Sequence, residues 1–364
     1  MGQIGRKLVL EDGSVFEGYG FGSTDDRFVE LVFNTSMVGY QEIISDLSYT
    51  GQAVVMTYPL IGNYGICEDD YESDVPGISG LIVRQYCDSP SNFRSTGKLE
   101  DVMKKYDIAG IYGVDTRQIT RRIRDKGTCR AVIIDADKDT GQALDDIRNW
   151  DAPTDQVARS STRDIYDYPQ QGDCSRGTIA VIDCGIKKNI LRMMAGRGYR
   201  ITVVPWNTDA GTIMSLDPAG VFISNGPGNP EDCVPTIETI KHIKGRVPIF
   251  GICLGHQIIC LAYGAGTYKL KFGHRGGNHP VKDLATGRIE ITSQNHSYAV
   301  IPESLDGTGL TVTHINLLDN TVEGVECPQD NLFCVQYHPE SAPGPCDSAY
   351  LFDRFFRNIG KQTL

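Results

Sequence analysis

The sequence predicts an α/β protein with a β-rich N-terminal domain and a C-terminal α/β domain whose sheet is mostly parallel. Its length of 364 residues exceeds that of one ordinary compact domain, which favours two. Residues 1–150 consist largely of short apolar, β-branched stretches, whereas strands and helices alternate over residues 178–364. The intervening residues 151–177 are rich in Asp, Ser, Pro, Gln and Gly, which predicts a linker or an arm lying on the surface.

The N-terminal domain opens with a predicted hairpin, because Asp12-Gly13 separates two apolar stretches in LVLEDGSVFEG. A helix is expected in TRQITRRIRDKGT, where Ile119 and Ile123 are four residues apart and Gly127 provides a stop. Further strands are expected in LVFNTSM, AVVMTYPL, SGLIVRQY and CRAVIID.

The C-terminal domain has the alternation that is typical of βαβ units and a parallel sheet. In such sheets the functional residues lie at the carboxyl ends of the strands. Strands are expected in TIAVIDC, YRITVVPW, AGVFIS and VPIFGIC, and helices in KKNILRMMAGRG, VPTIETIKHIKGR and LGHQIICLAYGA.

Composition and charge narrow the class of protein. The 46 acidic and 35 basic residues give a formal net charge of −11, which argues against a nucleic-acid-binding surface; residues 117–130 form the most basic stretch. No apolar run reaches the ~18 residues of a membrane span, and the polar start does not resemble a signal peptide. The eleven cysteines are scattered and form no C-x-x-C pair, which favours a cytoplasmic protein with reduced, mostly buried thiols.

Cys253 stands at a predicted strand-to-helix turn in VPIFGICLGHQ. Gly251 and Gly255 flank it in a G-x-C-x-G arrangement, the thiol version of a nucleophile elbow. The glycines allow neighbouring chain segments to pass close to a sharply turned residue. The helix N-terminus favours the thiolate, so Cys253 is a candidate nucleophile. Cys260, inside the following helix and without flanking glycines, is expected to be a core residue.

A base for this nucleophile is predicted at His338, which follows an apolar strand in LFCVQYHPES. Residues i and i+2 of an extended chain point to the same side, so the carboxylate of Glu340 can orient the imidazole. Pro339 favours the extended conformation at His338. His256 is a rival base, ranked below His338 because on the helix after Cys253 it can equally cap or pack. No pair of histidines or cysteines has the spacing of a metal site, so no metal is expected.

The segment ISNGPGNPE (223–231) is a strand followed by a glycine-rich loop, which can aim backbone N–H groups at an oxyanion. A plain turn is the alternative. The segment does not have the spacing of a dinucleotide fingerprint, and no phosphate-binding P-loop motif occurs in the sequence.

Together SNGPG, GICLGHQ and YHPE resemble the class I (triad) glutamine amidotransferases. Further motifs narrow the resemblance to the glutamine-hydrolysing small subunit of carbamoyl-phosphate synthase, and it covers essentially the whole chain. The C-terminal motifs are KFGHRGGNHPV, TSQNHSYAV and ESAPGPCD; the N-terminal ones are FNTSMVGYQEIISDLSYTGQ, TYPLIGNYG and GVDTRQITRRIRDKG.

The resemblance implies a division of labour between two subunits. The small subunit releases ammonia from glutamine, and a large synthetase subunit combines the ammonia with bicarbonate at the expense of ATP, with Mg. Ammonia would pass through an internal tunnel, and the product would feed arginine or pyrimidine synthesis. This chain would therefore hold no cofactor of its own and would act in a hetero-oligomer.

The family motifs also imply roles for individual residues. Cys253 would be the nucleophile, His338 the base and Glu340 the supporting acid. Where the family often reads QNHGF this chain reads QNHSY; if the glycine position needs positive φ, Ser297 would be strained. The oxyanion would be held by Leu254 and Gly226, and glutamine by Gln257, Gly228, Asn295, Ser297, Tyr298 and, from the N-terminal domain, Ser48.

Two other functions are compatible with parts of this pattern. A stand-alone γ-glutamyl hydrolase or cysteine peptidase would use the same nucleophile, but the long β-rich N-terminal domain matches no protease signal. A non-catalytic regulatory or scaffold subunit would keep the fold, but it would be expected to lose catalytic positions. Ammonia release by the purified chain, alone and with a synthetase partner, distinguishes the three.

Overall fold

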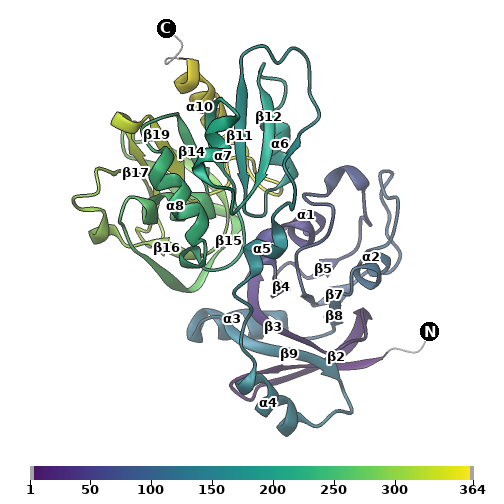
Figure 1. Cartoon of the computed structure of the whole chain (residues 1–364). Coiled ribbons are helices and arrows are strands. Elements are labelled where there is room, and N and C mark those ends of the chain that lie inside the picture. Colours follow the sequence, from purple (N-terminus) through teal and green to yellow (C-terminus); the bar gives the residue numbers. More distant parts are fainter. Residues whose placement is uncertain (1–3, 361–364) are drawn as a thin grey trace. The chain divides into compact units, whose positions relative to one another are not determined.

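The computed structural model describes residues 4–360, and the chain divides into two compact units, Met1–Pro153 and Thr154–Leu364 (Figure 1). The segment 151–177, expected to be a linker or a surface arm, contains α5 (Gln156–Ser160) and β10 (Tyr166–Asp167). Strand β10 pairs antiparallel with β12 (Arg200–Pro205), so most of this segment belongs to the C-terminal unit. None of the helices between residues 4 and 360 is long and apolar enough to cross a membrane.

The N-terminal unit is built around a closed barrel with the strand order β1-β2-β8-β6-β4-β3-β9. The predicted hairpin is confirmed: β1 and β2 pair antiparallel, and Gly13 in their turn has a φ of 87°. The barrel strands are β1 (Gly5–Leu10), β2 (Val15–Gly22), β3 (Arg27–Asn34), β4 (Gln52–Met56), β6 (Gly80–Val83), β8 (Ala109–Tyr112) and β9 (Cys129–Asp135); β5 (Leu60–Ile61) and β7 (Gln85–Tyr86) form a separate two-stranded sheet.

The helix expected in this unit is α3 (Thr116–Lys126). Ile119 and Ile123 are buried, the Asp115 side chain accepts from the Gln118 main-chain N–H at the N-terminus, and Gly127 ends the helix. The other helices of this unit are α1 (Tyr40–Ser45), α2 (Leu99–Lys105) and α4 (Thr140–Asn149).

The C-terminal unit contains one sheet with the order β10-β12-β11-β13-β14-β19-β18-β17-β15-β16. The predicted parallel part is confirmed, because β12, β11, β13, β14 and β19 pair in parallel. The sheet as a whole is mixed, since β19, β18, β17, β15 and β16 pair antiparallel. The remaining strands are β11 (Thr178–Asp183), β13 (Pro218–Ile223), β14 (Ile249–Ile252), β15 (Thr267–Asp283), β16 (Ile289–Val300), β17 (Thr311–Asn316), β18 (Val322–Cys327) and β19 (Leu332–Val335).

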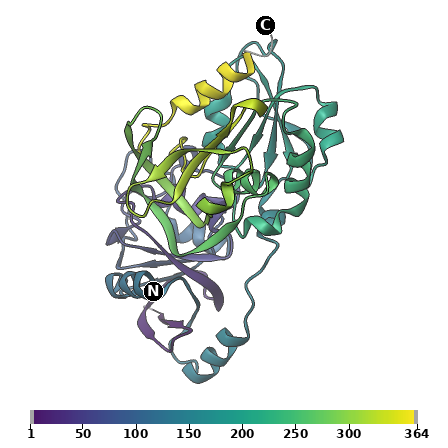
Figure 2. The same ribbon diagram turned by 90° about the vertical axis from the view of Figure 1, so that its left-hand side faces the viewer.

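Helices cover both faces of the parallel part. Alternate residues of β11 enter different cores: Ala180 and Ile182 join one, and Ile179 and Val181 join the other. The first core includes residues of α7 (Ala210–Ser215), α8 (Val234–Ile243) and α9 (Leu254–Ala262); the second includes residues of α6 (Lys188–Met194) and α10 (Tyr350–Gly360). Figure 2 shows α10, in yellow, on the opposite side of the sheet from the green helices.

Candidate active site

Cys253 lies between β14 and α9, at the carboxyl end of a central strand. Its backbone has a φ of 54° and a ψ of −105°, a conformation that is unfavourable for a residue with a side chain and costs roughly 1–3 kcal/mol. Two backbone hydrogen bonds hold it there, from Cys253 N–H to Val335 O (2.9 Å) and from Gln257 N–H to Cys253 O (3.2 Å). This is the strained turn that the sequence predicts for a nucleophile elbow.

Both flanking glycines are required by close packing. A Cβ atom at Gly255 would lie 2.3 Å from the carbonyl oxygen of Ile223. A Cβ at Gly251 would lie 2.5 Å from Cδ1 of Ile259 and 3.0 Å from the backbone of Gly255. Strand β13 and helix α9 therefore lie so close to the elbow that only glycine fits at positions 251 and 255.

His338 follows β19, the strand that pairs in parallel with β14, so it approaches from the neighbouring strand end. Its Nδ1 lies 2.6 Å from Oε1 of Glu340, and both side chains are fully buried. The backbone N–H of His338 donates to Ser293 O (2.9 Å), which fixes the segment against β16. The predicted pairing of His338 with Glu340 is thus present in the structure.

The surroundings of His338 favour its protonated form. Burial lowers the pKa of His338, but the carboxylate of Glu340 and the sulfur of Cys253 raise it to about 9, against an opposing charge on Lys187. Nδ1 donates to Glu340, and Nε2 has no other partner of normal hydrogen-bond geometry among the described residues. Nε2 is therefore the nitrogen available for exchanging a proton with the Cys253 sulfur.

The loop after β13 lies against the start of α9. A Cβ atom at Gly226 would meet the carbonyl oxygen of Cys184 at 2.1 Å and Cδ2 of Leu254 at 2.8 Å, so the loop backbone passes directly beside Leu254. Leu254 is the first residue of α9, and its N–H belongs to the group that a helix leaves without an intrahelical acceptor. Gly228 has a φ of 87°, which favours glycine. This arrangement suits the predicted oxyanion site.

Strand β16 brings the predicted glutamine-binding residues beside the elbow. The Cys253 thiol lies 3.6 Å from the carbonyl oxygen of Asn295. The side-chain amide of Gln257 donates to Tyr298 O (2.8 Å) and to Oε1 of Gln336 (2.9 Å). Both amide hydrogens of Gln257 are thus used within the protein, and this side chain connects α9 to β16 and to the segment after β19.

Ser297 is not strained. It lies within β16 and is absent from the residues with positive φ, so the position tolerates serine where the family often has glycine. Its hydroxyl accepts a hydrogen bond from Nη2 of the buried Arg275. Ser297 therefore gains a partner that a glycine could not provide.

Ser48 lies in the N-terminal unit, in the 3-10 turn Leu47–Tyr49, where its backbone N–H donates to Asp46 Oδ1 (2.9 Å). It is 8% exposed. Its role in holding glutamine stays a prediction.

Lys187 is the main site residue that sequence reasoning missed. Its Nζ lies 3.6 Å from Oε1 of Glu340 and donates to Ala342 O (3.4 Å). It follows β11, so the rule that functional residues lie at the carboxyl ends of parallel strands could have identified it.

The rival base His256 is buried in the core, as is Cys260. Burial, and then the charge of His314, lowers the pKa of His256 to about 3, so it is neutral at pH 7. Its Nδ1 contacts the Cys334 sulfur at 3.2 Å. The structure therefore confirms the core position predicted for Cys260 and, for His256, favours packing over the role of a base.

Among residues 4–360, two buried groups of side chains have potential metal-ligand atoms within 4.8 Å of one another. In the first, formed by His256, Cys260 and Cys334, burial raises the pKa of the Cys334 thiol well above its usual value, and a neutral thiol is a poor ligand.

The second group consists of His274, His296 and Glu323. Burial lowers the pKa of His274, but hydrogen bonds to Asp319 and Glu323 raise it to about 9, so its ring is protonated at neutral pH. A protonated imidazole does not bind a metal ion. In both groups a ligand atom would therefore have to lose its proton before a metal ion could bind.

Comparisons with known proteins agree with this geometry. Residues 180–358 match the family model "Glutamine amidotransferase class-I", and residues 8–133 match "Carbamoyl-phosphate synthase small chain, CPSase domain". The carbamoyl phosphate synthase small chain of Fusobacterium nucleatum is 50% identical over 97% of this chain and 98% of its own length. The pyrimidine-specific small chains of Halalkalibacterium halodurans and Bacillus subtilis are 51% and 49% identical, each over 97% of this chain and 96% of its own length.

Proposed function

Because this chain belongs to the family of carbamoyl-phosphate synthase small chains, we propose that Cys253, His338 and Glu340 carry out its glutaminase reaction. The observation that carries this assignment is the buried hydrogen bond of 2.6 Å between His338 and Glu340, on the strand next to the Cys253 elbow. It supplies an oriented base to a strained, buried nucleophile, as a triad requires.

In the first half of the reaction, the Cys253 thiolate attacks the side-chain amide carbon of glutamine, and the carbonyl oxygen becomes an oxyanion. The backbone N–H groups of Gly226 and Leu254 donate to this oxygen. As the C–N bond breaks, Nε2 of His338 gives its proton to the leaving nitrogen. Ammonia departs, and a γ-glutamyl thioester on Cys253 remains.

In the second half, water attacks the thioester carbon and loses a proton to the neutral Nε2 of His338. The C–S bond breaks, glutamate leaves, and the protonated imidazole and the thiolate are restored. Glu340 keeps Nδ1 protonated and oriented through both halves. Asn295, Ser297, Tyr298, Gly228 and Gln257 hold the substrate or shape its pocket.

The ammonia is consumed by a large synthetase chain, which adds it to bicarbonate with ATP and Mg. We infer the larger partner from the name "small chain" that the relatives carry. All eleven cysteines are free thiols, which supports a reducing, cytoplasmic setting. Some relatives are named pyrimidine-specific, and others carry no such restriction in their names. We therefore assign the carbamoyl phosphate to pyrimidine synthesis, arginine synthesis or both.

Substitution of the nucleophile in the assembled two-chain enzyme tests this proposal. Cys253→Ser should abolish carbamoyl-phosphate synthesis from glutamine and spare synthesis from added ammonia. Cys260→Ser, a change of a buried thiol in the adjacent helix, should retain glutamine-dependent synthesis. Loss of both activities in a correctly assembled Cys253→Ser complex would refute the proposal, and a full glutaminase rate without any partner would favour a stand-alone hydrolase.

A further inference from the structure

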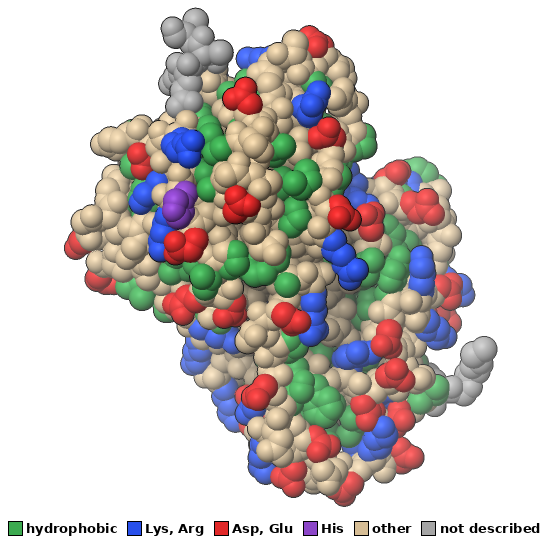
Figure 3. All heavy atoms as spheres, in the orientation of Figure 1, with side chains coloured by type: hydrophobic (Ala, Val, Ile, Leu, Met, Phe, Trp, Pro, Cys, Tyr) green, Lys and Arg blue, Asp and Glu red, His purple; other side chains and the backbone are tan. Residues whose placement is uncertain are grey.

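Helix α3 concentrates positive charge on an acidic protein. It carries five basic residues and one acidic residue, whereas the whole chain has a formal net charge of −11. Ile119 and Ile123 are buried, so the charged positions face away from the barrel. Figure 3 shows Lys and Arg side chains gathered at the left-hand edge of the N-terminal unit, where Figure 1 draws α3.

Part of this charge is neutralised within the unit. Arg122 Nη1 and Lys126 Nζ both lie 2.9 Å from Oδ2 of Asp12, in the turn of the first hairpin. Arg124 lies 3.0 Å from its neighbour Asp125. The C-terminal half of α3 therefore has acidic partners of its own.

The two arginines in the N-terminal half of α3 have no acidic partner among residues 4–360. Arg117 and Arg121 are exposed and form no ion pair with any residue between 4 and 360. They are four positions apart, so they lie on one side of the helix, where like charges repel each other. The exposed Arg84 donates from Nη1 to Val114 O (3.3 Å), just before the helix. Ion pairing within residues 4–360 therefore accounts for neither Arg117 nor Arg121.

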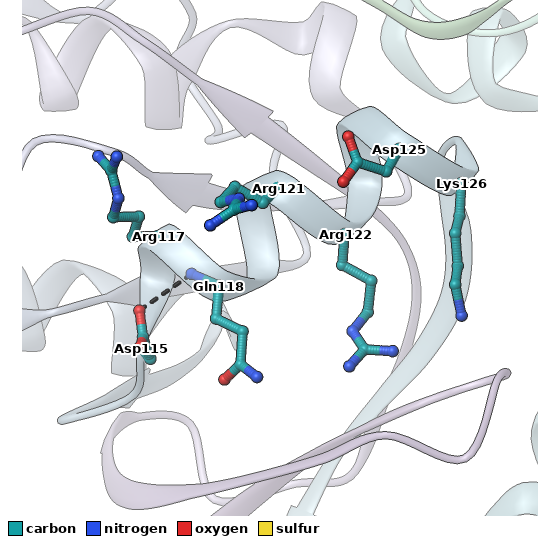
Figure 4. A pocket seen from close by; sticks show the side chains of 7 residues that line it. All are labelled: Asp115, Arg117, Gln118, Arg121, Arg122, Asp125 and Lys126. Carbon is teal, nitrogen blue, oxygen red and sulfur yellow. Dashed lines mark hydrogen bonds between the residues drawn. The ribbon is translucent and has the colours of Figure 1, made fainter.

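The same surface is hollowed. A depression of about 450 Å³ lies along α3 and is lined entirely by this helix and its cap, as Figure 4 shows. An arginine guanidinium can bind a carboxylate through two parallel hydrogen bonds, which a lysine ammonium cannot do. A surface of arginines is therefore well suited to acidic side chains. Its lining residues are Asp115, Arg117, Gln118, Arg121, Arg122, Asp125 and Lys126.

We propose that the exposed face of α3, centred on Arg117 and Arg121, docks an acidic surface of the large synthetase chain. This inference rests on the proposed function and adds the surface to it. Residues 8–133, which include α3, match the domain named for the small chain, whereas Cys253 and His338 lie in the amidotransferase match at 180–358. The unpaired arginines are thus in the part that is specific to the synthase, and carboxylates of the partner would complete their ion pairs.

Charge reversal in the full chain tests the docking surface. R117E/R121E should bind the purified large chain at least tenfold more weakly at low salt, mainly through slower association. The difference should shrink as salt is added, because the charges are exposed. The matched control, K104E/R148E, reverses two exposed charges on α2 and α4 of the same unit and should change the affinity less than twofold.

The readouts separate this inference from the proposed function. Glutaminase activity of the isolated R117E/R121E chain should equal that of the wild type, which also shows that it folds. If the reversal variant is unstable, R117Q/R121Q must still bind the large chain several-fold more weakly. An affinity for the large chain within twofold of the wild type, or an equal loss in the control, overturns the docking surface alone. Failure of the wild-type chain to hydrolyse glutamine in the assembled two-chain enzyme overturns the proposed function.

Discussion

The ammonium group of Lys187 lies 3.6 Å from Oε1 of Glu340, and their side chains are 3% and 0% exposed. The same carboxylate oxygen contacts Nδ1 of His338, so one buried anion is shared by two cations. Removing Lys187 leaves Glu340 paired with His338, whereas removing Glu340 leaves two buried cations without their shared anion, which is costly. The ion pair of Lys187 with Glu340 therefore stabilises the fold around His338, and the charge of Lys187 lowers the pKa of this imidazole.

Lys187→Met should lower the free energy of unfolding by about 1–3 kcal/mol, because Glu340 loses one buried counterion but keeps its contact with His338. Urea unfolding at pH 7 measures this. The control Lys241→Met removes an exposed ion pair with Glu238 and should cost less than about 1 kcal/mol. A double variant that also carries Glu340→Gln should lose less stability than the sum of the two single losses; strictly additive losses would contradict the coupling.

Glu340→Gln should move the alkaline fall of kcat/KM for glutamine to lower pH. His338 must be protonated to expel ammonia, and its pKa of about 9 places the fall near that pH in the wild type. Loss of the carboxylate removes the largest influence that raises this pKa, so the fall should move down by about 1–3 pH units. Lys187→Met should move it in the opposite direction. An unchanged profile in both variants would exclude His338 as the titrating group.

Local patterns were sufficient to predict most elements, the strained turn at Cys253 and the contact of His338 with Glu340. The elbow at Cys253 is encoded by adjacent glycines, and the contact of His338 with Glu340 follows from their i, i+2 spacing in extended chain. Both are short-range relationships. The alternation of strands and helices from Thr178 likewise implied the parallel part of the sheet, since such crossovers place strands in parallel.

Relationships that depend on long-range pairing could not be predicted in this way. Strand β15 contains Gly, His, Asn and Pro residues that do not favour a strand by themselves, and it forms because it pairs with β16 and β17. That pairing places Asn295 beside Cys253. The contact of Lys187 with Glu340 joins residues from different parts of the sheet. Closure of the N-terminal barrel also requires pairings between distant strands, such as β1 with β9.

Gly255→Ala should be severely destabilising, because its Cβ would lie 2.3 Å from a backbone oxygen of Ile223 that cannot move independently. We expect a loss of at least ~3 kcal/mol and loss of glutaminase activity, as an overpacked core cannot keep the elbow. Gly97→Ala is the matched control: no heavy atom lies within 4 Å of its Cβ position, so its effect should be within ~0.5 kcal/mol. Thermal unfolding and glutaminase assays of both variants decide the matter, and a stable, active Gly255→Ala chain would contradict the packing argument.

Buried neutral histidines should make the fold sensitive to acid. The pKa of His256 is lowered to about 3 by burial and then by His314, so the unfolded chain binds a proton below about pH 6.5 that the folded chain refuses. Stability should therefore fall as pH decreases from 6.5 toward 3, by about 1.4 kcal/mol per pH unit for each such group. His279 and His314, whose pKa values burial lowers to about 4, act in the same direction.

The contribution of His256 can be isolated by substitution. His256→Gln removes one titrating group, so the slope of unfolding free energy against pH between 4.5 and 6 should decrease by about one proton. Glutaminase activity should persist at pH 7.5, because the proposed base is His338. His256→Leu provides a second, apolar replacement in case the amide is not accommodated. Urea titrations across this pH range give the slopes, and slopes equal to the wild type in both variants would show that His256 is protonated in the folded chain.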